Sequence, residues 1–232
     1  MLRKLTIPKI YHCNFNPADF FKGLYFYWDD LKGYSKYGNL DKENIMEISL
    51  IRHGKSQFVH KEAVTFNEFK QWVKNYDFYG IAEEPSCPAE TLQKVAAADI
   101  IVTSDLKRAI ESAKFLDPKA NAITDPLFRE IELPISTRQG SNLKLSPVFW
   151  AMLLRIMWFS GYSNNYESFD EAKLRAKKAA QQLILYSSEF QSVALIGHGF
   201  FNIMIAKELQ KKGWKGKRKL GARHWNCVSY SL

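Results

Sequence analysis

From Met46 to the carboxyl end, short runs rich in β-branched residues alternate with longer segments of helical periodicity. This alternation is typical of a parallel sheet that is covered by helices on both faces, so an α/β fold is predicted. The expected strands are Ile48–Ile51, Ile100–Thr103, Ala122–Thr124, Val193–Ile196 and a closing strand Trp225–Tyr230. The expected helices are Thr65–Tyr76, Ala89–Ala98, Lys107–Phe115, Glu167–Ser188 and Phe201–Lys211.

The chain of 232 residues is long enough for one domain with an appendage. Residues 1–45 are crowded with aromatic side chains but follow no helical or strand period. We expect them to be an appended N-terminal segment that either docks through its aromatic residues or is partly disordered. The folded domain is then predicted to span residues 46–232.

The composition, with 46% hydrophobic and 25% charged residues, is that of a soluble globular protein. No apolar run approaches the roughly 20 residues of a membrane span, and the first residues lack a signal-peptide pattern, so a cytoplasmic location is expected. The three cysteines form no CxxC pair, and the five histidines show no metal-ligand spacing. We therefore expect no disulfide, no metal site and no cofactor.

The net charge of +9 favours anionic ligands, and much of it lies in the run Lys211–Lys219. Such a run can bind nucleic acid or acidic lipid, but it is more often a solvated helix end followed by a loop. No helix-turn-helix, zinc-finger or RNA-binding pattern accompanies it. We therefore expect no nucleic-acid partner.

Polar side chains follow the predicted strands at four places. Ligands of open α/β sheets bind at the carboxyl ends of the strands, so these residues are expected to meet there. A histidine with a pKa near neutrality can attack phosphorus without a metal, and arginine offers paired donors that match phosphate oxygens. The residues therefore indicate phosphoryl transfer. They are Arg52-His53-Gly54, Ser104-Asp105 with Arg108, the stretch Arg129–Glu132, and Gly197-His198-Gly199.

In this order the segments resemble the opening motif, second arginine segment, acid segment and second histidine of the histidine phosphatase superfamily, which includes the cofactor-dependent phosphoglycerate mutases. The resemblance runs from Met46 to about Leu232. It implies a three-layer α/β/α sandwich with a mostly parallel central sheet and a phosphate pocket at the carboxyl edge of that sheet. The matching segments are Leu50–Ser56, Thr103–Ala109, Leu127–Glu130 and Ile196–Gly199.

Within this site, His53 is predicted to attack phosphorus in line and to become a phosphohistidine. Arg52, Arg108 and His198 are predicted to bind the equatorial oxygens, where negative charge accumulates in the transition state. These roles agree with those that the resemblance implies.

The site also needs an acid that protonates the leaving oxygen and then activates water. Glu130 is the predicted acid, because it lies in the matched segment and a carboxyl near phosphate or in an apolar pocket keeps its proton more readily. Glu132 lies on the same side of an extended segment and is the fallback. Asp105 is expected to orient arginines instead of transferring protons.

Two positions depart from the mutases of this superfamily. Lys55 and Val59 stand where many members have an acidic residue and an asparagine, and the long mutase segment that follows is absent. A mutase must retain and return the phosphoryl group, so these departures favour hydrolysis. Lys55-Ser56 is similar to the branch that acts on phosphohistidine proteins, although that branch is usually shorter.

We therefore expect a metal-independent phosphatase that hydrolyses a small phosphomonoester through a phosphohistidine. The alternatives are a phosphohistidine phosphatase of signalling proteins and, less favoured, a phosphoglycerate mutase-type phosphotransferase. A phosphate-binding module without activity is disfavoured by the intact set of histidines, arginines and acid.

Residues 147–162 form a nearly uniform apolar stretch in which Arg155 is the only charge. As a helical insertion it has to be covered on most sides, although it is too short to span a bilayer. Three interpretations are open: a core helix, a cap over the phosphate pocket, and a homodimer contact. In the cap interpretation, Trp150 and Trp158 lie near the phosphate and exclude bulky phosphoproteins.

Overall fold

The computed structural model describes residues 45–83, 86–136, 142–217, 221 and 223–232. The predicted appended segment, residues 1–45, therefore falls outside the described residues except for its last position. Within them lies a mixed, mostly parallel sheet of six strands in the spatial order β3-β2-β4-β1-β6-β5. The strands are β1 (Glu47–Arg52), β2 (Ile100–Thr103), β3 (Ile123–Thr124), β4 (Ser192–Gly197), β5 (Lys215–Gly216) and β6 (Cys227–Ser231).

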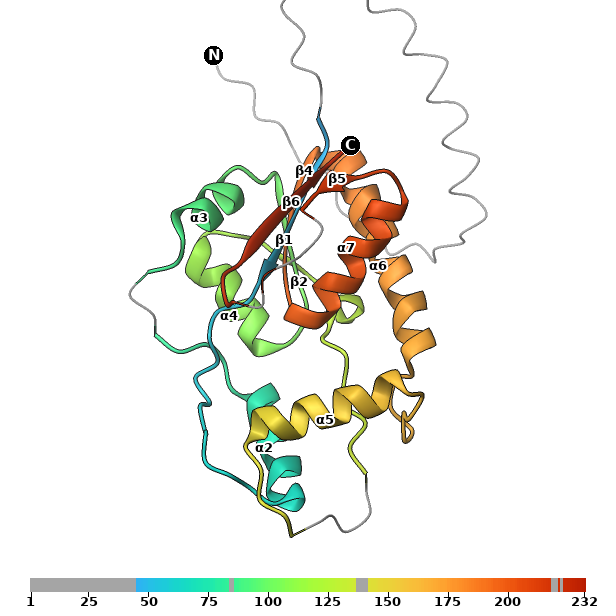
Figure 1. Cartoon of the computed structure of the whole chain (residues 1–232). Coiled ribbons are helices and arrows are strands. Elements are labelled where there is room, and N and C mark those ends of the chain that lie inside the picture. Colours follow the sequence, from blue (N-terminus) through green and yellow to red (C-terminus); the bar gives the residue numbers. More distant parts are fainter. Residues whose placement is uncertain (1–44, 84–85, 137–141, 218–220, 222) are drawn as a thin grey trace, which may run out of the picture. The chain divides into compact units, whose positions relative to one another are not determined.

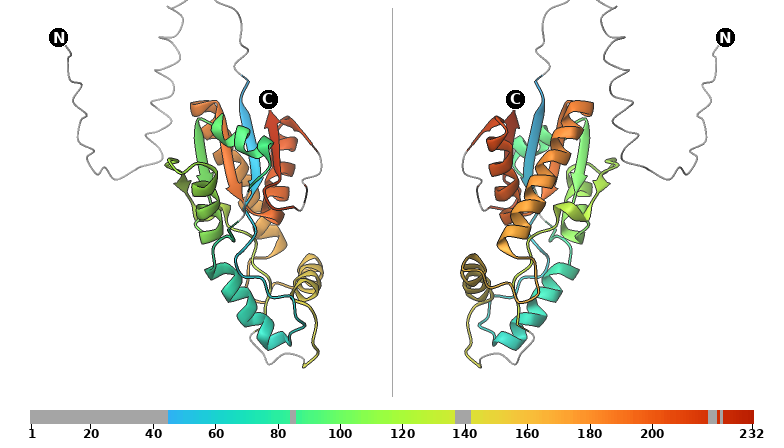
Figure 2. Two further views of the ribbon diagram at one scale, coloured as in Figure 1. Left: turned by 90° about the vertical axis from the view of Figure 1, so that its left-hand side faces the viewer. Right: turned by 90° about the vertical axis from the view of Figure 1, so that its right-hand side faces the viewer.

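The strands β3, β2, β4 and β1 run parallel, whereas β6 is antiparallel to both β1 and β5. Figure 1 shows α6 and α7 together on one side of the sheet and α3 and α4 on the other, and Figure 2 shows these layers from two further directions. The predicted three-layer α/β/α sandwich is confirmed. The helices are α2 (Phe66–Phe78), α3 (Ala89–Ala96), α4 (Lys107–Leu116), α5 (Pro147–Phe159), α6 (Phe169–Phe190) and α7 (Gly199–Lys211), with a short 3-10 helix, η2 (Pro126–Phe128).

The side chains of β1 alternate between the two helical layers. Ile48 and Leu50 belong to the hydrophobic cluster that includes α6 and α7, and Ile51 belongs to the cluster that includes α3 and α4. Because successive side chains of a strand point to opposite faces, this short apolar run supplies both clusters. The result is a sheet whose central strands are buried on both faces, as parallel sheets require.

The helices α2 and α5 lie together beyond the carboxyl ends of the parallel strands (Figure 1). Phe66 and Phe69 of α2 pack there against Trp150 of α5. The start of α2 is fixed by a capping box, in which the Glu68 carboxylate accepts from the Thr65 N–H and the Thr65 hydroxyl oxygen accepts from the Glu68 N–H. None of the helices in the described ranges is both long and apolar enough to cross a membrane.

The carboxyl-terminal region differs from the prediction in two respects. The closing strand begins at Cys227 instead of Trp225, because Trp225 adopts the left-handed backbone conformation, with φ 61°, and turns the chain. Its ring packs so closely on Gly54 that a Cβ there would lie 2.1 Å away. The basic run is more than a helix end and a loop, since Trp214 is buried and Lys215–Gly216 forms the edge strand β5. Residues 218–220 of that run lie outside the described residues.

Candidate active site

The parallel register of β1 and β4 brings the two predicted histidines together. Arg52 is paired with Gly197, so the residues that follow, His53 and His198, leave the sheet side by side. The His53 N–H donates to the Gly197 carbonyl oxygen at 3.0 Å, and the two imidazole centroids are 5.1 Å apart. Both side chains are buried, with exposed fractions of 3% and 0%.

The surroundings of His53 define its tautomer and its charge. Its Nδ1 lies 2.7 Å from the Gly54 carbonyl oxygen, and because a carbonyl can only accept, Nδ1 carries the hydrogen and Nε2 keeps a lone pair. Burial, followed by the positive charges of Arg108 and Arg52, holds the pKa of His53 well below its usual value. The imidazole is therefore neutral at physiological pH, which is the form that a nucleophile needs.

His198 is the N-cap residue of α7, and its Nε2 lies 2.6 Å from the hydroxyl oxygen of Ser104. Burial, His53 and the neighbouring arginines lower its pKa well below the usual value. Its Nδ1 is buried and has no hydrogen-bond partner in the described part of the chain. A buried polar atom of this kind is expected to meet a partner, and a bound ligand can supply one.

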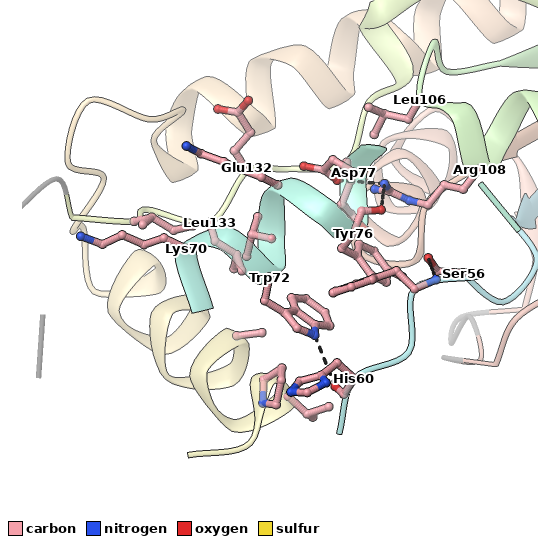
Figure 3. A pocket seen from close by; sticks show the side chains of 18 of the residues that line it. Ser56, His60, Lys70, Trp72, Tyr76, Asp77, Leu106, Arg108, Glu132 and Leu133 are labelled. Atoms are coloured by element: carbon pink, nitrogen blue, oxygen red, sulfur yellow. Dashed lines mark hydrogen bonds and ion pairs between the residues drawn. The ribbon is translucent and has the colours of Figure 1, made fainter. Parts of the chain in front are cut away.

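The predicted arginines flank these histidines. The Arg52 guanidinium lies against Gly199, where an added Cβ would come within 3.2 Å of Nε. Arg108 is in the first turn of α4 and is 2% exposed. Its Nη1 donates to the Asp77 carboxylate at 2.8 Å, and its guanidinium stacks 4.9 Å from the centroid of the Tyr76 ring (Figure 3). The end of α2 thus orients Arg108 toward the site.

Glu130 has a structural contact that sequence reasoning missed. Its two carboxylate oxygens accept from the N–H groups of Phe200 and Phe201 at 3.0 and 2.9 Å. Since α7 receives no side-chain cap from His198, Glu130 provides the cap from another loop. A catalytic role for Glu130 stays a prediction, as does the fallback role of Glu132, whose side chain is exposed.

Asp105 holds a different arginine from the one expected. Its carboxylate accepts two hydrogen bonds from Arg129, and these bonds hold the pKa of Asp105 below its usual value. The same pairing raises the pKa of Arg129. Arg108 is held by Asp77 instead, so the two arginines have separate carboxylate partners.

His224 is a third histidine at the site, and sequence analysis did not select it. Its ring centroid lies 5.4 Å from that of His53, and its Nδ1 donates to the His53 carbonyl oxygen at 3.2 Å. His224 precedes β6, whose antiparallel pairing with β1 brings the start of one strand to the end of the other. The available signal was therefore a histidine just before the last strand, which becomes informative only when that strand is known to pair with β1.

A cavity of about 890 Å³ lies beside these residues and between α2 and α5. Arg108, Glu130 and His224 line it, as do Glu132 and the α5 residues Pro147, Val148, Ala151 and Arg155. The prediction that Trp150 and Trp158 face the phosphate is wrong, since both are buried in hydrophobic clusters and neither lines the cavity. The helix α5 therefore has one face in the core and another along the cavity.

Among the described residues, no three His, Cys, Asp or Glu side chains gather closely enough to hold a metal ion. Independence of metals and cofactors stays a prediction.

The family model of the histidine phosphatase superfamily, branch 1, matches residues 83–231, which is more than half of the chain. The chain belongs to this superfamily. The matched segment contains Arg108, Glu130 and His198, whereas Arg52 and His53 precede it. A search of curated protein sequences gave no match.

Solved structures with similar folds include three from different sources. A phosphoglycerate mutase from Bacillus anthracis shares 15% identity with this histidine phosphatase superfamily member, over 82% of this chain and 88% of that one, with a TM-score of 0.52. A phosphoserine phosphatase mutant from Entamoeba histolytica shares 14% identity over 80% and 93%, with a TM-score of 0.49. A mycobacterial glucosyl-3-phosphoglycerate phosphatase shares 17% identity over 72% and 80%, with a TM-score of 0.45. The likeness to the mutase shows a shared fold.

Proposed function

We propose that this superfamily member is a metal-independent phosphatase, which hydrolyses a small phosphomonoester through a phosphohistidine at His53. The observation that carries the proposal is the buried, neutral His53, whose Nδ1–H is held by the Gly54 carbonyl so that Nε2 keeps its lone pair. Arg52, Arg108 and His198 surround it as donors for a phosphoryl group.

In the first step, Nε2 of His53 attacks phosphorus, the N–P bond forms and the P–O bond to the alcohol breaks. Glu130 gives its proton to the departing oxygen, so the alcohol leaves neutral. The arginines bind the equatorial oxygens. When the Ser104 hydroxyl donates to Nε2 of His198, Nδ1 carries a hydrogen and can donate to a phosphoryl oxygen.

In the second step, water attacks the phosphohistidine and the N–P bond breaks. Glu130, now a carboxylate, takes a proton from the water. Inorganic phosphate leaves, and His53 returns to its neutral form with the same hydrogen on Nδ1. Each turnover therefore consumes one water and needs no other reactant.

The cavity supports a small substrate over a phosphorylated protein. It extends between α2 and α5, so the leaving group enters a space bounded by two helices. A phosphohistidine side chain on a folded protein needs a more open approach. The departures at Lys55 and Val59 support hydrolysis over a mutase reaction, because phosphoryl return requires the group to be retained.

The test is to mix the enzyme with a ³²P-labelled phosphomonoester, quench in alkali and locate the label. We expect label on His53, turnover that survives EDTA, and no label or turnover in His53→Asn, whose folding is checked by circular dichroism. Label on another residue, or an active His53→Asn variant, contradicts the covalent mechanism. A phosphohistidine protein that reacts over a hundredfold faster than every small ester supports the signalling alternative instead.

A further inference from the structure

The cavity between α2 and α5 is much larger than a phosphate group needs. Its volume of about 890 Å³ falls in the range of pockets that enclose a whole small ligand, roughly 300–1,000 Å³. Arg108 and His224 line it, and His224 in turn contacts His53. The cavity is therefore continuous with the candidate phosphate site, and the part of a substrate beyond its phosphate would occupy it.

The wall that α2 contributes is aromatic. Trp72 and Tyr76 lie one turn apart on this helix, with their rings stacked at a centroid distance of 5.1 Å (Figure 3). The indole Nε1 of Trp72 donates to the His60 carbonyl oxygen at 3.3 Å, so its polar atom is engaged by the protein. What Trp72 offers to a ligand is the hydrocarbon surface of its ring.

The wall that α5 contributes is aliphatic. Pro147, Val148 and Ala151 lie on successive turns of one helical face and line the cavity. Leu133 and Ile135 extend the same kind of surface from the loop before α5. A ligand held between the two helices is thus met mainly by carbon.

The charged groups along the cavity are engaged elsewhere or reach solvent. Arg108 is paired with Asp77, and the Glu130 carboxylate caps α7. Lys70 places its ammonium 5.2 Å from the centroid of the Phe66 ring, and Lys74 is exposed. The deep walls therefore carry little charge that would select a second anionic group.

We propose that this cavity binds the alcohol portion of the substrate, and that the enzyme prefers phosphomonoesters of apolar alcohols. The proposal rests on the function proposed above and narrows its substrate class. Each methylene that enters such a cavity is expected to raise kcat/KM by about fourfold, because that factor corresponds to the usual gain for burying one CH₂ group.

The first test is a series of ethyl, butyl, hexyl and 2-phenylethyl phosphates, whose parent alcohols are similar in acidity. We expect kcat/KM to rise on the order of a hundredfold from ethyl to hexyl, with 2-phenylethyl phosphate at least equal to butyl. A flat series overturns the proposal. So does a preference for 6-phosphonooxyhexanoate over hexyl phosphate, because recognition would then depend on a second anion at the lysines.

The second test uses two variants of the same helix. Ala151→Phe fills the cavity, and Ile156→Phe, at a position that is 58% exposed and does not line it, is the matched control. We expect Ala151→Phe to lower the hexyl-to-ethyl ratio of kcat/KM at least tenfold and Ile156→Phe to leave that ratio unchanged. An unchanged ratio in a folded Ala151→Phe variant overturns the proposal.

Failure of this inference is distinguishable from failure of the proposed function. Turnover of p-nitrophenyl phosphate and label on His53 report the phosphatase mechanism without reference to the cavity. A flat alkyl series in an enzyme that passes both assays overturns the apolar-alcohol proposal alone.

Discussion

The imidazole of His224 lies 5.4 Å from that of His53, measured between ring centroids, and donates a hydrogen bond from Nδ1 to the His53 carbonyl oxygen. This contact joins the turn before β6 to the end of β1. It fixes the backbone of the residue that we propose as the nucleophile. Since His224 also lines the cavity, its ring is adjacent to the space where the phosphate and the leaving group meet.

We predict that His224→Ala lowers kcat/KM for phosphomonoesters by about 10- to 100-fold, the range expected for losing one hydrogen bond to a charged group. Steady-state kinetics measure this, and a thermal melt shows whether the fold is kept. Arg223→Ala is the matched control, because Arg223 is adjacent and exposed and does not line the cavity. Equal activity of the two variants would remove His224 from the site.

The contrast between His53 and His224 shows how far the sequence alone reaches. Short apolar runs followed by polar residues predict β1 and β4, and parallel pairing then predicts that His53 and His198 meet. The last strand carries an equally clear pattern, but a pattern does not encode the neighbour or direction of a strand. The position of His224 depends on both.

Long-range side-chain contacts are the other class that sequence reasoning missed. The pairing of Asp77 with Arg108 and the capping of α7 by Glu130 join residues 31 and 70 positions apart for the closest cited atoms. Such contacts follow from how the loops and helices pack, which no local period specifies. Helix boundaries that depend on local capping, such as Thr65 with Glu68, were predictable because both partners lie within one turn.

The stability of the domain is predicted to fall as the solution becomes acidic. His53 and His198 have lowered pKa values in the folded state, so below about pH 6.5 the unfolded chain binds more protons than the folded one. The free energy of unfolding therefore rises with pH, and each histidine accounts for about 2 kcal/mol between pH 5 and pH 7. Urea denaturation across this range measures the slope.

The matched variants for this measurement are His53→Gln and His198→Gln. Each removes one titrating group, so each should lose about half of the pH-dependent change that the two histidines cause. A wild-type slope that persists in the double variant would show that other groups are responsible.

Glu130→Gln is predicted to slow alkyl phosphates far more than p-nitrophenyl phosphate, whose leaving group scarcely needs a proton. A general acid typically contributes about 10²- to 10⁴-fold, and that is the expected loss for the alkyl esters. Because Glu130 also caps α7, the variant should lose about 1 kcal/mol of stability as well. Kinetics at a temperature well below the melting transition separate the two effects.

Glu132→Gln is the control for this assignment. Its side chain lines the cavity but is exposed, so it should alter stability little. If Glu132→Gln shows the leaving-group dependence and Glu130→Gln does not, Glu132 is the acid and Glu130 is only a helix cap. An equal loss for both types of ester in Glu130→Gln moves the acid role to another residue.

Trp150 provides the test of whether the inner face of α5 is core or part of the substrate site. Its side chain is 6% exposed, its Nε1 donates to the Val64 carbonyl oxygen at 2.9 Å, and its ring meets Phe66 edge-on. Trp150→Ala should therefore cost about 3–5 kcal/mol of stability. Phe149→Ala, at a neighbouring position that is 47% exposed, should change stability by only about 0.5 kcal/mol.

The kinetic readout decides between the two roles. If Trp150 is core, the ratio of kcat/KM for hexyl and ethyl phosphate should change less than twofold in Trp150→Ala, measured where the variant is fully folded. The cavity-facing Ala151→Phe change should instead shift that ratio strongly. A Trp150→Ala variant that keeps its melting temperature but changes its substrate preference would contradict the core assignment, because lost packing cannot alter selectivity without lowering stability.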